Sequence, residues 1–184
     1  NNIDGFVESR RKVFYTAELV ANNEIKVAAL AGEVGSKANY HHGEGSAEET
    51  ITRMAQAYPA ARILPLLQPR GSFGTRDQGY KNAGASRYIF TTINKKLTDK
   101  LFRKEDRYIL EYNMDDGERY EPKHYAPIIP YVLCENNHLP ATGWQVNIYA
   151  RDLKAIFKNL RALLNGDIEK CEKLPIDKYN FKKI

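Results

Sequence analysis

Hydrophobic residues recur at the spacing of an amphipathic helix over much of the chain. Near its start, Val13, Ala17 and Val20 fall on one helical face, with Arg10 and Lys12 close to the beginning of the same helix. The spacing predicts five helices in all, over residues 7–20, 26–34, 46–58, 86–102 and 151–165.

Local signals mark the ends of two of these helices. Ser46 and Glu49 have the spacing of a capping box, in which each side chain satisfies a free backbone donor at the helix start. Pro59 marks the end of that helix, and Gly166 stands where a C-terminal cap of the last helix is expected.

Short apolar runs predict strands, over residues 63–67, 108–112 and 131–134. The segment between the last two contains Pro122, Pro127 and Pro130, which confine any strand pairing within that segment to the edges of a sheet. Polar stretches that contain glycine predict exposed loops, over residues 35–45 and 68–84. A helix-turn-helix or winged-helix module has this order of elements: a helix, a tight link, a second helix, a polar loop and a third helix. We therefore expect an α+β fold of that kind.

The composition of the 184 residues is that of a globular domain, with 42% hydrophobic and 28% charged residues. No apolar run approaches the roughly 20 residues of a membrane helix, so no membrane span is expected. Cys134 and Cys171 are too few for a disulfide framework or a zinc finger, and they fit a reducing compartment. The net charge of +5 suggests a polyanionic partner. Because the chain opens on Asn1 with neither an initiator Met nor a signal peptide, we expect one piece of a longer protein.

Basic or polar residues gather in four places, at Arg10-Arg11-Lys12, His41-His42, Thr75-Arg76 with Lys81, and Arg87-Tyr88. Arg, Lys, His and Thr side chains donate hydrogen bonds to phosphate oxygens, and glycine lets a backbone come close to a duplex. A tyrosine hydroxyl is a poor nucleophile at neutral pH, but an adjacent guanidinium can stabilise the charge that develops during attack on phosphorus. By themselves these residues favour binding to nucleic acid over attack on it.

Each of these groups also has an ordinary explanation. The three basic residues at positions 10–12 can form a solvated helix face. The two histidines can be polar loop residues, because no third metal ligand has suitable spacing. The segment Gly71–Gly74 lacks the Lys-Ser/Thr ending of a phosphate-binding P-loop, so we exclude that kind of site. Tyr88 is one of 12 tyrosines, and composition alone gives it no preference.

Longer motifs follow one another along nearly the whole chain: Asp4-Gly5-Phe6 with Arg11-Lys12-Val13, Tyr40-His41-His42-Gly43-Glu44, Gly71-Ser72-Phe73-Gly74-Thr75-Arg76, Gly84-Ala85-Ser86-Arg87-Tyr88-Ile89-Phe90-Thr91, Tyr125-Ala126-Pro127-Ile128-Ile129-Pro130 and Thr142-Gly143-Trp144. In type and order they resemble the breakage-reunion core of type IIA DNA topoisomerases. The motif around Tyr88 is the most specific of them.

This resemblance implies a CAP-like winged-helix domain that forms the DNA gate over residues 1–150, and a linking helix with the beginning of a tower domain over residues 151–184. Tyr88 would attack a DNA phosphodiester and form a 5′-phosphotyrosyl bond. The resemblance assigns further catalytic roles to Arg87, Arg11 and His42. It also implies contacts to DNA from Lys12, His41, Thr75, Arg76, Lys81 and Pro140.

The chain departs from the family pattern at three places. Val7-Glu8-Ser9-Arg10 replaces the usual Lys-Pro-Gly-Gln, and Tyr80 stands where glycine is common. Pro140 occupies the position of an isoleucine that wedges between base pairs in cellular relatives, and a proline there resembles the branch encoded by large DNA viruses. Pro140 is therefore either an intercalating wedge or an ordinary turn proline.

The resemblance also implies partners and cofactors. The whole enzyme would bind double-stranded DNA as a homodimer and use Mg²⁺ and ATP, both held outside this chain, so we expect the chain alone to bind DNA without relaxing supercoils. Its location would be intracellular, in the nucleus or, for a viral protein, in the host cytoplasm. The alternative from another class is a non-enzymatic winged-helix DNA-binding or architectural protein. A tyrosine recombinase is disfavoured, because its Arg, His and Tyr residues follow a different chain order.

Overall fold

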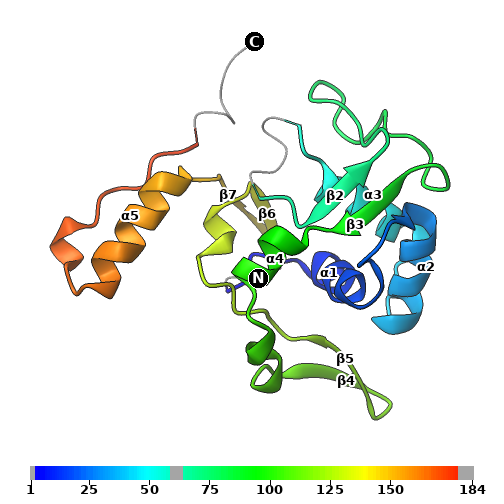
Figure 1. Ribbon diagram of the computed structural model, residues 1–184, viewed down its shortest axis with the longest axis horizontal. Helices are drawn as coiled ribbons and strands as arrows, with labels where there is room; N and C mark the ends of the chain where they lie inside the picture. Colours follow the sequence, from blue (N-terminus) through cyan, green and yellow to red (C-terminus); the bar gives the residue numbers. More distant parts are fainter. Residues whose placement is uncertain (1–2, 59–63, 178–184) are drawn as a thin grey trace.

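The computed structural model describes residues 3–58 and 64–177, except for the side chains of residues 139–141. Three helices that pack on one another come first, α1 (Glu8–Val20), α2 (Val27–Lys37) and α3 (Glu44–Ala55) (Figure 1). An antiparallel sheet of order β1-β3-β2 packs against them, formed by β1 (Ile25–Lys26), β2 (Leu67–Arg70) and β3 (Phe90–Ile93). This core occupies the right-hand half of Figure 1.

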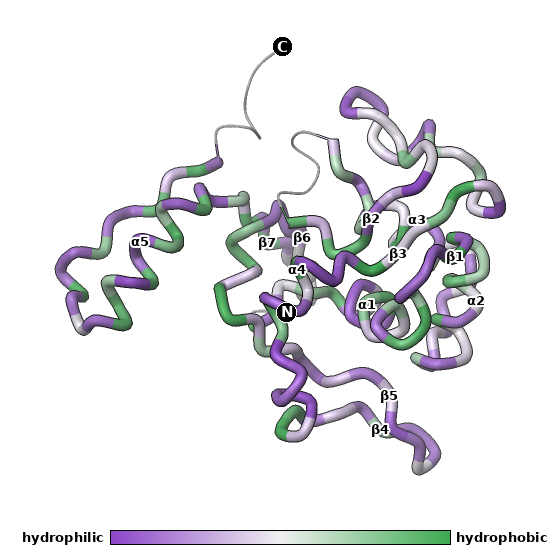
Figure 2. Tube along the Cα trace, viewed as in Figure 1, coloured by the Kyte–Doolittle hydropathy of each residue, from purple (hydrophilic) through white to green (hydrophobic). Residues whose placement is uncertain are grey.

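The remaining elements surround this core. Helix α4 (Lys95–Leu101) leads through the 3₁₀ turn η1 (Lys104–Tyr108) into an antiparallel hairpin, β4 (Tyr112–Asp115) with β5 (Glu118–Pro122). After the turn η2 (Tyr131–Leu133) comes a second hairpin, β6 (Asn137–Ala141) with β7 (Trp144–Ile148), followed by α5 (Leu153–Leu164) and η3 (Ile168–Lys170). Helix α5 extends away from the core at the end opposite to α2, and the tip of β4–β5 is a hydrophilic projection (Figures 1 and 2).

An aromatic cluster joins the second half of the chain to α1. Phe14 of α1 lies 4.9 Å between ring centroids from both Phe102 and Tyr125. Phe6 adds edge-on contacts to Phe14 and Tyr131, at 5.7 and 5.6 Å. All five rings are buried. Since each buried aromatic removes about 150–250 Å² from water, this cluster is a major source of the stability that holds residues 102–131 against α1.

Two adjacent cations of α1 are buried as well. Arg11 donates through Nε to Asp4 Oδ2 at 2.8 Å, and through Nη2 to Asp4 Oδ1 at 3.1 Å and to the carbonyl of Phe6 at 3.0 Å. Lys12 Nζ lies 3.0 Å from the buried carboxylate of Glu121 and donates to the Ala38 carbonyl at 2.6 Å. These ion pairs therefore tie α1 to the N-terminal segment, the end of α2 and strand β5.

Most of the helices predicted from periodicity are confirmed, with end positions that differ by a few residues. The capping box is wrong. Helix α3 begins at Glu44, with Gly43 at the N-cap position and φ of 80°. The hydroxyl of Ser46 instead lies 2.9 Å from that of Tyr40, and Glu49 pairs with Arg53. The last helix is capped at its start by Asp152, which accepts a hydrogen bond from the N–H of Ala155 at 2.8 Å.

The long helix predicted over residues 86–102 is wrong. The chain forms a turn at residues 85–88, then strand β3, and only then the short helix α4. Residues 91–93 are β-branched, and burial alternates along β3, with Thr91 and Ile93 buried. Pairing with both β1 and β2 makes β3 the central strand of the sheet, and tertiary pairing overrides the helical spacing of the apolar residues.

The predicted strands at 108–112 and 131–134 are also wrong. Lys104–Tyr108 and Tyr131–Leu133 are 3₁₀ turns, and the strands lie at β4 and β5 on either side of a two-residue turn. Asp116 and Gly117 in this turn have φ of 46° and 82°, the conformation of a tight hairpin. The strand predicted over residues 63–67 is displaced, since β2 begins at Leu67, and residue 63 lies outside the described residues.

The expected α+β class is confirmed. Three helices followed by an antiparallel sheet, with a long connection between β2 and β3, are consistent with the expected winged helix. The division into domains at residue 150 stays a prediction, and the segment from Tyr179, expected to begin the tower, lies outside the described residues. Among the described residues, no helix is long and apolar enough to cross a membrane.

The Asp4–Arg11 pair gives a testable pH dependence. Burial tends to raise the pKa of Asp4, but hydrogen bonds from Arg11 and from the N–H groups of Phe6 and Tyr125 hold that pKa below its ordinary value. The ionised carboxylate therefore stabilises the fold above the unfolded-state pKa of about 4, and this stability is lost as the pH falls through the lower folded-state pKa.

Replacing Asp4 by Asn should lower the free energy of unfolding at pH 7 by about 3–5 kcal/mol, because Arg11 would keep a buried charge without its carboxylate. Urea unfolding at pH 7 and at acid pH measures both effects. The variant should lose less stability on acidification than the parent. Equal losses would show that Asp4 does not contribute to the acid sensitivity.

Candidate active site

Tyr88 stands on a short turn between the glycine-rich loop and β3. Its side chain is 72% exposed, while the next residue, Ile89, is buried. The Tyr88 N–H donates to the Ala85 carbonyl at 2.8 Å, which closes the turn. The carbonyls of Ser86 and Ile89 accept hydrogen bonds from the first N–H groups of α2, at 3.2 and 3.0 Å. The fold therefore presents a tyrosine hydroxyl to solvent on a turn whose backbone is anchored on both sides.

Arg87 places a guanidinium beside this tyrosine. Its Cζ atom lies 5.3 Å from the centroid of the Tyr88 ring, and its side chain is exposed. A guanidinium at this position is always charged and has several N–H donors. It can stabilise negative charge on a phenolate, or on a phosphoryl group attacked by the phenol, so the structure brings together these two predicted catalytic residues.

The glycine-rich loop, residues 71–84, folds back on itself next to Tyr88. Gly84 donates to the Ser72 carbonyl at 2.9 Å, and Thr75 pairs with Gly79 across the loop. Gly74 has φ of 96°, and a Cβ at this position would lie 1.9 Å from the carbonyl oxygen of Gly79. Only glycine permits this close approach of the two backbone segments.

The predicted DNA-binding residues of this loop lie at its exposed tip. Thr75, Arg76 and Lys81 are all exposed. The Thr75 hydroxyl donates to Asp77 at 2.5 Å and accepts from Asn82 at 3.0 Å, so it orders the tip internally. The tip is therefore an ordered loop that exposes two cationic side chains, and the base of the same loop lies against Ile89, the residue after Tyr88.

The two predicted histidines precede α3 and are both exposed. The ring of His42 packs edge-on against the buried Tyr40, with centroids 5.3 Å apart, whereas His41 has no ring contact of this kind among those described. Within residues 3–58 and 64–177, no three His, Cys, Asp or Glu side chains gather closely enough to hold a metal ion.

Arg11 and Lys12 occupy a different environment from the exposed candidates. Both are 7% exposed, and protein acceptors engage the N–H groups described above. Sequence reasoning missed this burial because their carboxylate partners lie in other segments. Their contacts here are structural, and direct contact with DNA stays a prediction for both.

Pro140 lies in strand β6, where its register partner is Gln145 of β7. The hairpin projects exposed residues, including Trp144 and Val146 at 81% and 52% exposure. The two-residue turn contains Gly143 at φ of 73°. Pro140 therefore lies in a strand and not in the turn itself, and its role as a wedge stays a prediction.

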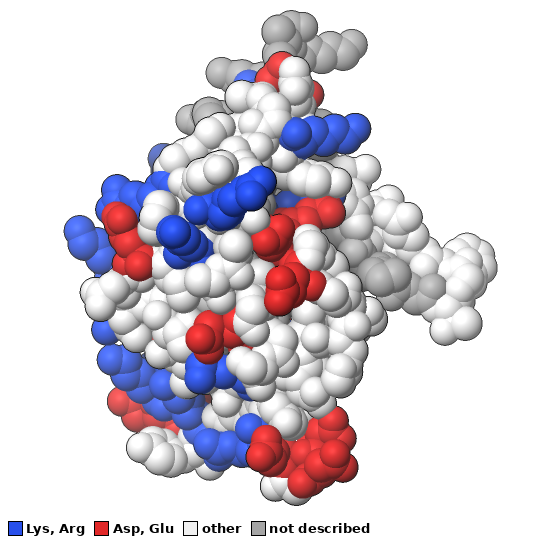
Figure 3. Space-filling model, turned by 90° about the vertical axis from the view of Figure 1, so that its right-hand side faces the viewer, with Lys and Arg blue, Asp and Glu red and all other residues white. Residues whose placement is uncertain are grey.

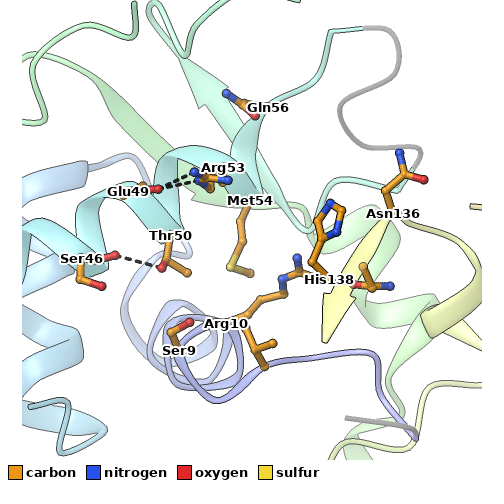
Figure 4. Close-up of a pocket in the computed structure, with 12 residues that line it drawn as sticks. Ser9, Arg10, Ser46, Glu49, Thr50, Arg53, Met54, Gln56, Asn136 and His138 are labelled. Carbon is orange, nitrogen blue, oxygen red and sulfur yellow. Dashed lines mark hydrogen bonds and ion pairs between the residues drawn. The ribbon is translucent and has the colours of Figure 1, made fainter. Parts of the chain in front are cut away.

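An open groove of about 480 Å³ connects the helices to the base of this hairpin (Figure 4). The start of α1, one face of α3 and the chain from Asn136 to His138 line it. Arg10, Arg53 and His138 lie around the groove, and Arg10 pairs with Glu135 at 3.1 Å. The sequence analysis did not identify Arg53 and His138 as candidate residues. For Arg53, its position four residues after Glu49 could have predicted an ion pair on one face of the helix.

Charge is not uniform over the surface. On the face shown in Figure 3, lysine and arginine side chains are interspersed with acidic ones, and acidic residues gather at its lower end. Asp115, Asp116 and Glu118 are all exposed at the β4–β5 turn, and this hairpin lies at the bottom of the molecule in Figure 1. The net positive charge of the chain therefore does not predict the charge of any single face.

The close backbone approach at Gly74 yields a prediction. Gly74→Ala should displace the loop, because its Cβ would overlap the Gly79 carbonyl. Gly79→Ala is the matched control, since Gly79 also has a positive φ but has open space around it, and should cost only about 1 kcal/mol. Hydrogen exchange at residues 75–82 and urea unfolding compare the two. Equal effects would show that the loop tolerates the extra atom.

Comparisons with known proteins show which family this chain belongs to. The family model that describes the A-subunit of DNA gyrase/topoisomerase IV matches residues 1–180. DNA topoisomerase 2 of Drosophila melanogaster is 42% identical over 165 residues, which cover 89% of this chain and 11% of that protein. Human DNA topoisomerase 2-alpha is 41% identical over 181 residues, covering 98% and 12%.

A solved structure agrees in fold as well as sequence. The crystal structure of the Plasmodium falciparum topoisomerase II DNA-binding, cleavage and re-ligation domain matches with a TM-score of 0.92 and 34% identity, over 99% of this chain and 25% of that one. The chain spans only 11–12% of the length of these two curated relatives. Since the family model covers almost all of its residues, the chain belongs to the A-subunit family of DNA gyrase/topoisomerase IV.

Proposed function

We propose that this chain is the DNA-cleaving and rejoining part of a type II DNA topoisomerase, with Tyr88 as the nucleophile. The observation that carries the proposal is the exposed Tyr88 on its anchored turn, with the Arg87 guanidinium beside it. Family membership and the likeness to a cleavage and re-ligation domain support it.

In the proposed reaction, the Tyr88 hydroxyl oxygen attacks a DNA phosphorus and loses its proton. The bond from phosphorus to the 3′ oxygen breaks, and that oxygen takes up a proton to become a free 3′-hydroxyl. One phosphodiester replaces another, so attack by the 3′-hydroxyl restores the strand without an external energy source. Arg87 stabilises the charge on the phosphoryl oxygens in both directions.

Other predicted residues have supporting roles in this proposal. His42 and Arg11 keep their predicted catalytic roles in this proposal, although Arg11 would have to leave its buried pair with Asp4 to reach DNA. His41, Thr75, Arg76 and Lys81 contact the DNA backbone, since all four are exposed. Lys12 supports this surface from within, because it binds the Ala38 carbonyl just before the histidines.

The whole enzyme proposed here is an intracellular homodimer, located in the nucleus or, if viral, in the host cytoplasm. In this proposal, Mg²⁺ and ATP are bound by other parts of the longer protein. The two subunits cut opposite strands of one duplex, so that a second duplex can pass. The chain alone is expected to bind DNA without relaxing supercoils.

Tyr88→Phe should abolish the covalent link between protein and DNA in the full-length enzyme, because the nucleophilic oxygen is removed. Denaturing gels with end-labelled DNA, under conditions that trap the cleaved state, detect the adduct. Tyr108→Phe is the matched control, since Tyr108 is 92% exposed on η1 and should retain the adduct. An adduct that survives in Tyr88→Phe would show that another nucleophile forms it, whereas a parent enzyme that forms no adduct would favour the non-enzymatic DNA-binding alternative.

Pro140→Gly should reduce DNA bending by the full-length enzyme, because glycine has no side chain to insert between base pairs. Energy transfer between dyes at the two ends of a short duplex measures the bend. Thr142→Ala in the turn of the same hairpin is the control and should keep the bend. If both variants bend DNA like the parent, Pro140 is not the wedge.

A further inference from the structure

The glycine-rich loop is joined to helix α3 by a small number of side-chain contacts. At its base, the Gln56 side chain donates to the Phe73 carbonyl at 3.0 Å, and Phe73 is buried in the core. Near its tip, the guanidinium of Arg53 stacks over the ring of Tyr80, with Cζ 4.1 Å from the ring centroid. The base and the tip are therefore fixed to α3 by different interactions.

A carboxylate on the same helix also binds the guanidinium of Arg53. Glu49, one helical turn before Arg53, accepts from Arg53 Nε at 2.8 Å and lies 2.6 Å from Nη2. The carboxylate thus holds two nitrogens of the guanidinium while its Cζ lies over the Tyr80 ring. Arginine stacks in this way better than lysine, because its charge is spread over a plane.

Tyr80 is well placed to transmit this contact to the reaction centre. Its carbonyl accepts from the Ala83 N–H at 3.0 Å, just before Gly84. A Cβ at Gly84 would lie 2.9 Å from the Ile89 side chain, so the end of the loop lies directly against the residue that follows Tyr88. A shift of Tyr80 would therefore move the end of the loop against the turn that carries the nucleophile.

The contact depends on the aromatic ring at position 80, because a residue without a ring could not lie under the Arg53 guanidinium in this way.

We propose that Arg53 and Tyr80 are positioning residues for DNA cleavage: their stack holds the tip of the glycine-rich loop so that Arg76 and Lys81 meet the phosphates next to the one that Tyr88 attacks. The inference rests on the proposed function and adds a residue pair to it. Neither side chain touches the reacting atoms, and each acts through the loop.

The test uses the full-length enzyme and a short duplex with one cleavage site. The rate of covalent adduct formation in a single turnover, the DNA affinity and its dependence on salt are measured for Tyr80→Leu, Tyr80→Phe, Arg53→Ala and the double variant Arg53→Ala/Tyr80→Leu. Tyr108→Leu, at an exposed tyrosine on η1, is the control for loss of a surface ring.

Tyr80→Leu and Arg53→Ala should each slow adduct formation by about three- to tenfold, because each removes the stack. The double variant should be no slower than either single one, and Tyr80→Phe should restore the rate because it keeps the ring face. The salt dependence of DNA binding should fall by the same amount in Tyr80→Leu and in Arg53→Ala, because both variants release Arg76 and Lys81 from their phosphates.

Three results would overturn the inference. One is a parental rate in Tyr80→Leu. Another is a slope of log DNA affinity against log salt concentration that falls by about one unit in Arg53→Ala but stays unchanged in Tyr80→Leu. That result would make Arg53 a direct phosphate contact. The third is a Tyr80→Phe variant as slow as Tyr80→Leu, which would implicate the hydroxyl. If the parent enzyme itself forms no adduct, the proposed function fails first, and that result is separate from the other three.

Discussion

The burial of two neighbouring cations in α1 is the constraint on which the rest of this fold depends. Arg11 and Lys12 cannot be buried without carboxylates, because an unpaired buried charge costs several kcal/mol. Asp4 and Glu121 supply them from segments before and long after the helix, and Glu121 also accepts from Asn113 at 2.8 Å. The pairs make the position of the helix, the N-terminal segment and the β4–β5 hairpin mutually dependent. The aromatic cluster beside them adds stability but little direction, since apolar contacts are not directional.

The turn that carries Tyr88 is held in place by helix α2, which in turn is held by one of these buried cations. Helix α2 is held at its end by Lys12, through the Ala38 carbonyl, and its start binds the turn that carries Tyr88. A helix start has free N–H groups that need acceptors, and here backbone carbonyls of the turn supply two of them. The turn is thus fixed by the helix rather than by the tyrosine side chain, which stays free to meet a substrate.

The sequence predicted what depends on local pattern and missed what depends on distant partners. Helical spacing located α1, α2, α3 and α5, and the motif around Tyr88 identified a residue that the structure exposes. The helix expected over residues 86–102 failed because β3 is held by pairing on both sides, which periodicity does not report. The burial of Lys12 was equally hidden, since Glu121 lies 109 residues further along the chain.

A rigid support suits the chemistry proposed for Tyr88. Exchange of one phosphodiester for another changes the energy little, so the same site must favour attack by the tyrosine and, later, attack by the 3′-hydroxyl. Strong binding of either ground state would slow one of the two directions. Fixed geometry aids both, because it lowers the entropic cost of bringing the reacting atoms together whichever oxygen attacks. The anchored turn, the tight loop at Gly74 and the Arg53–Tyr80 stack all provide geometry rather than binding energy.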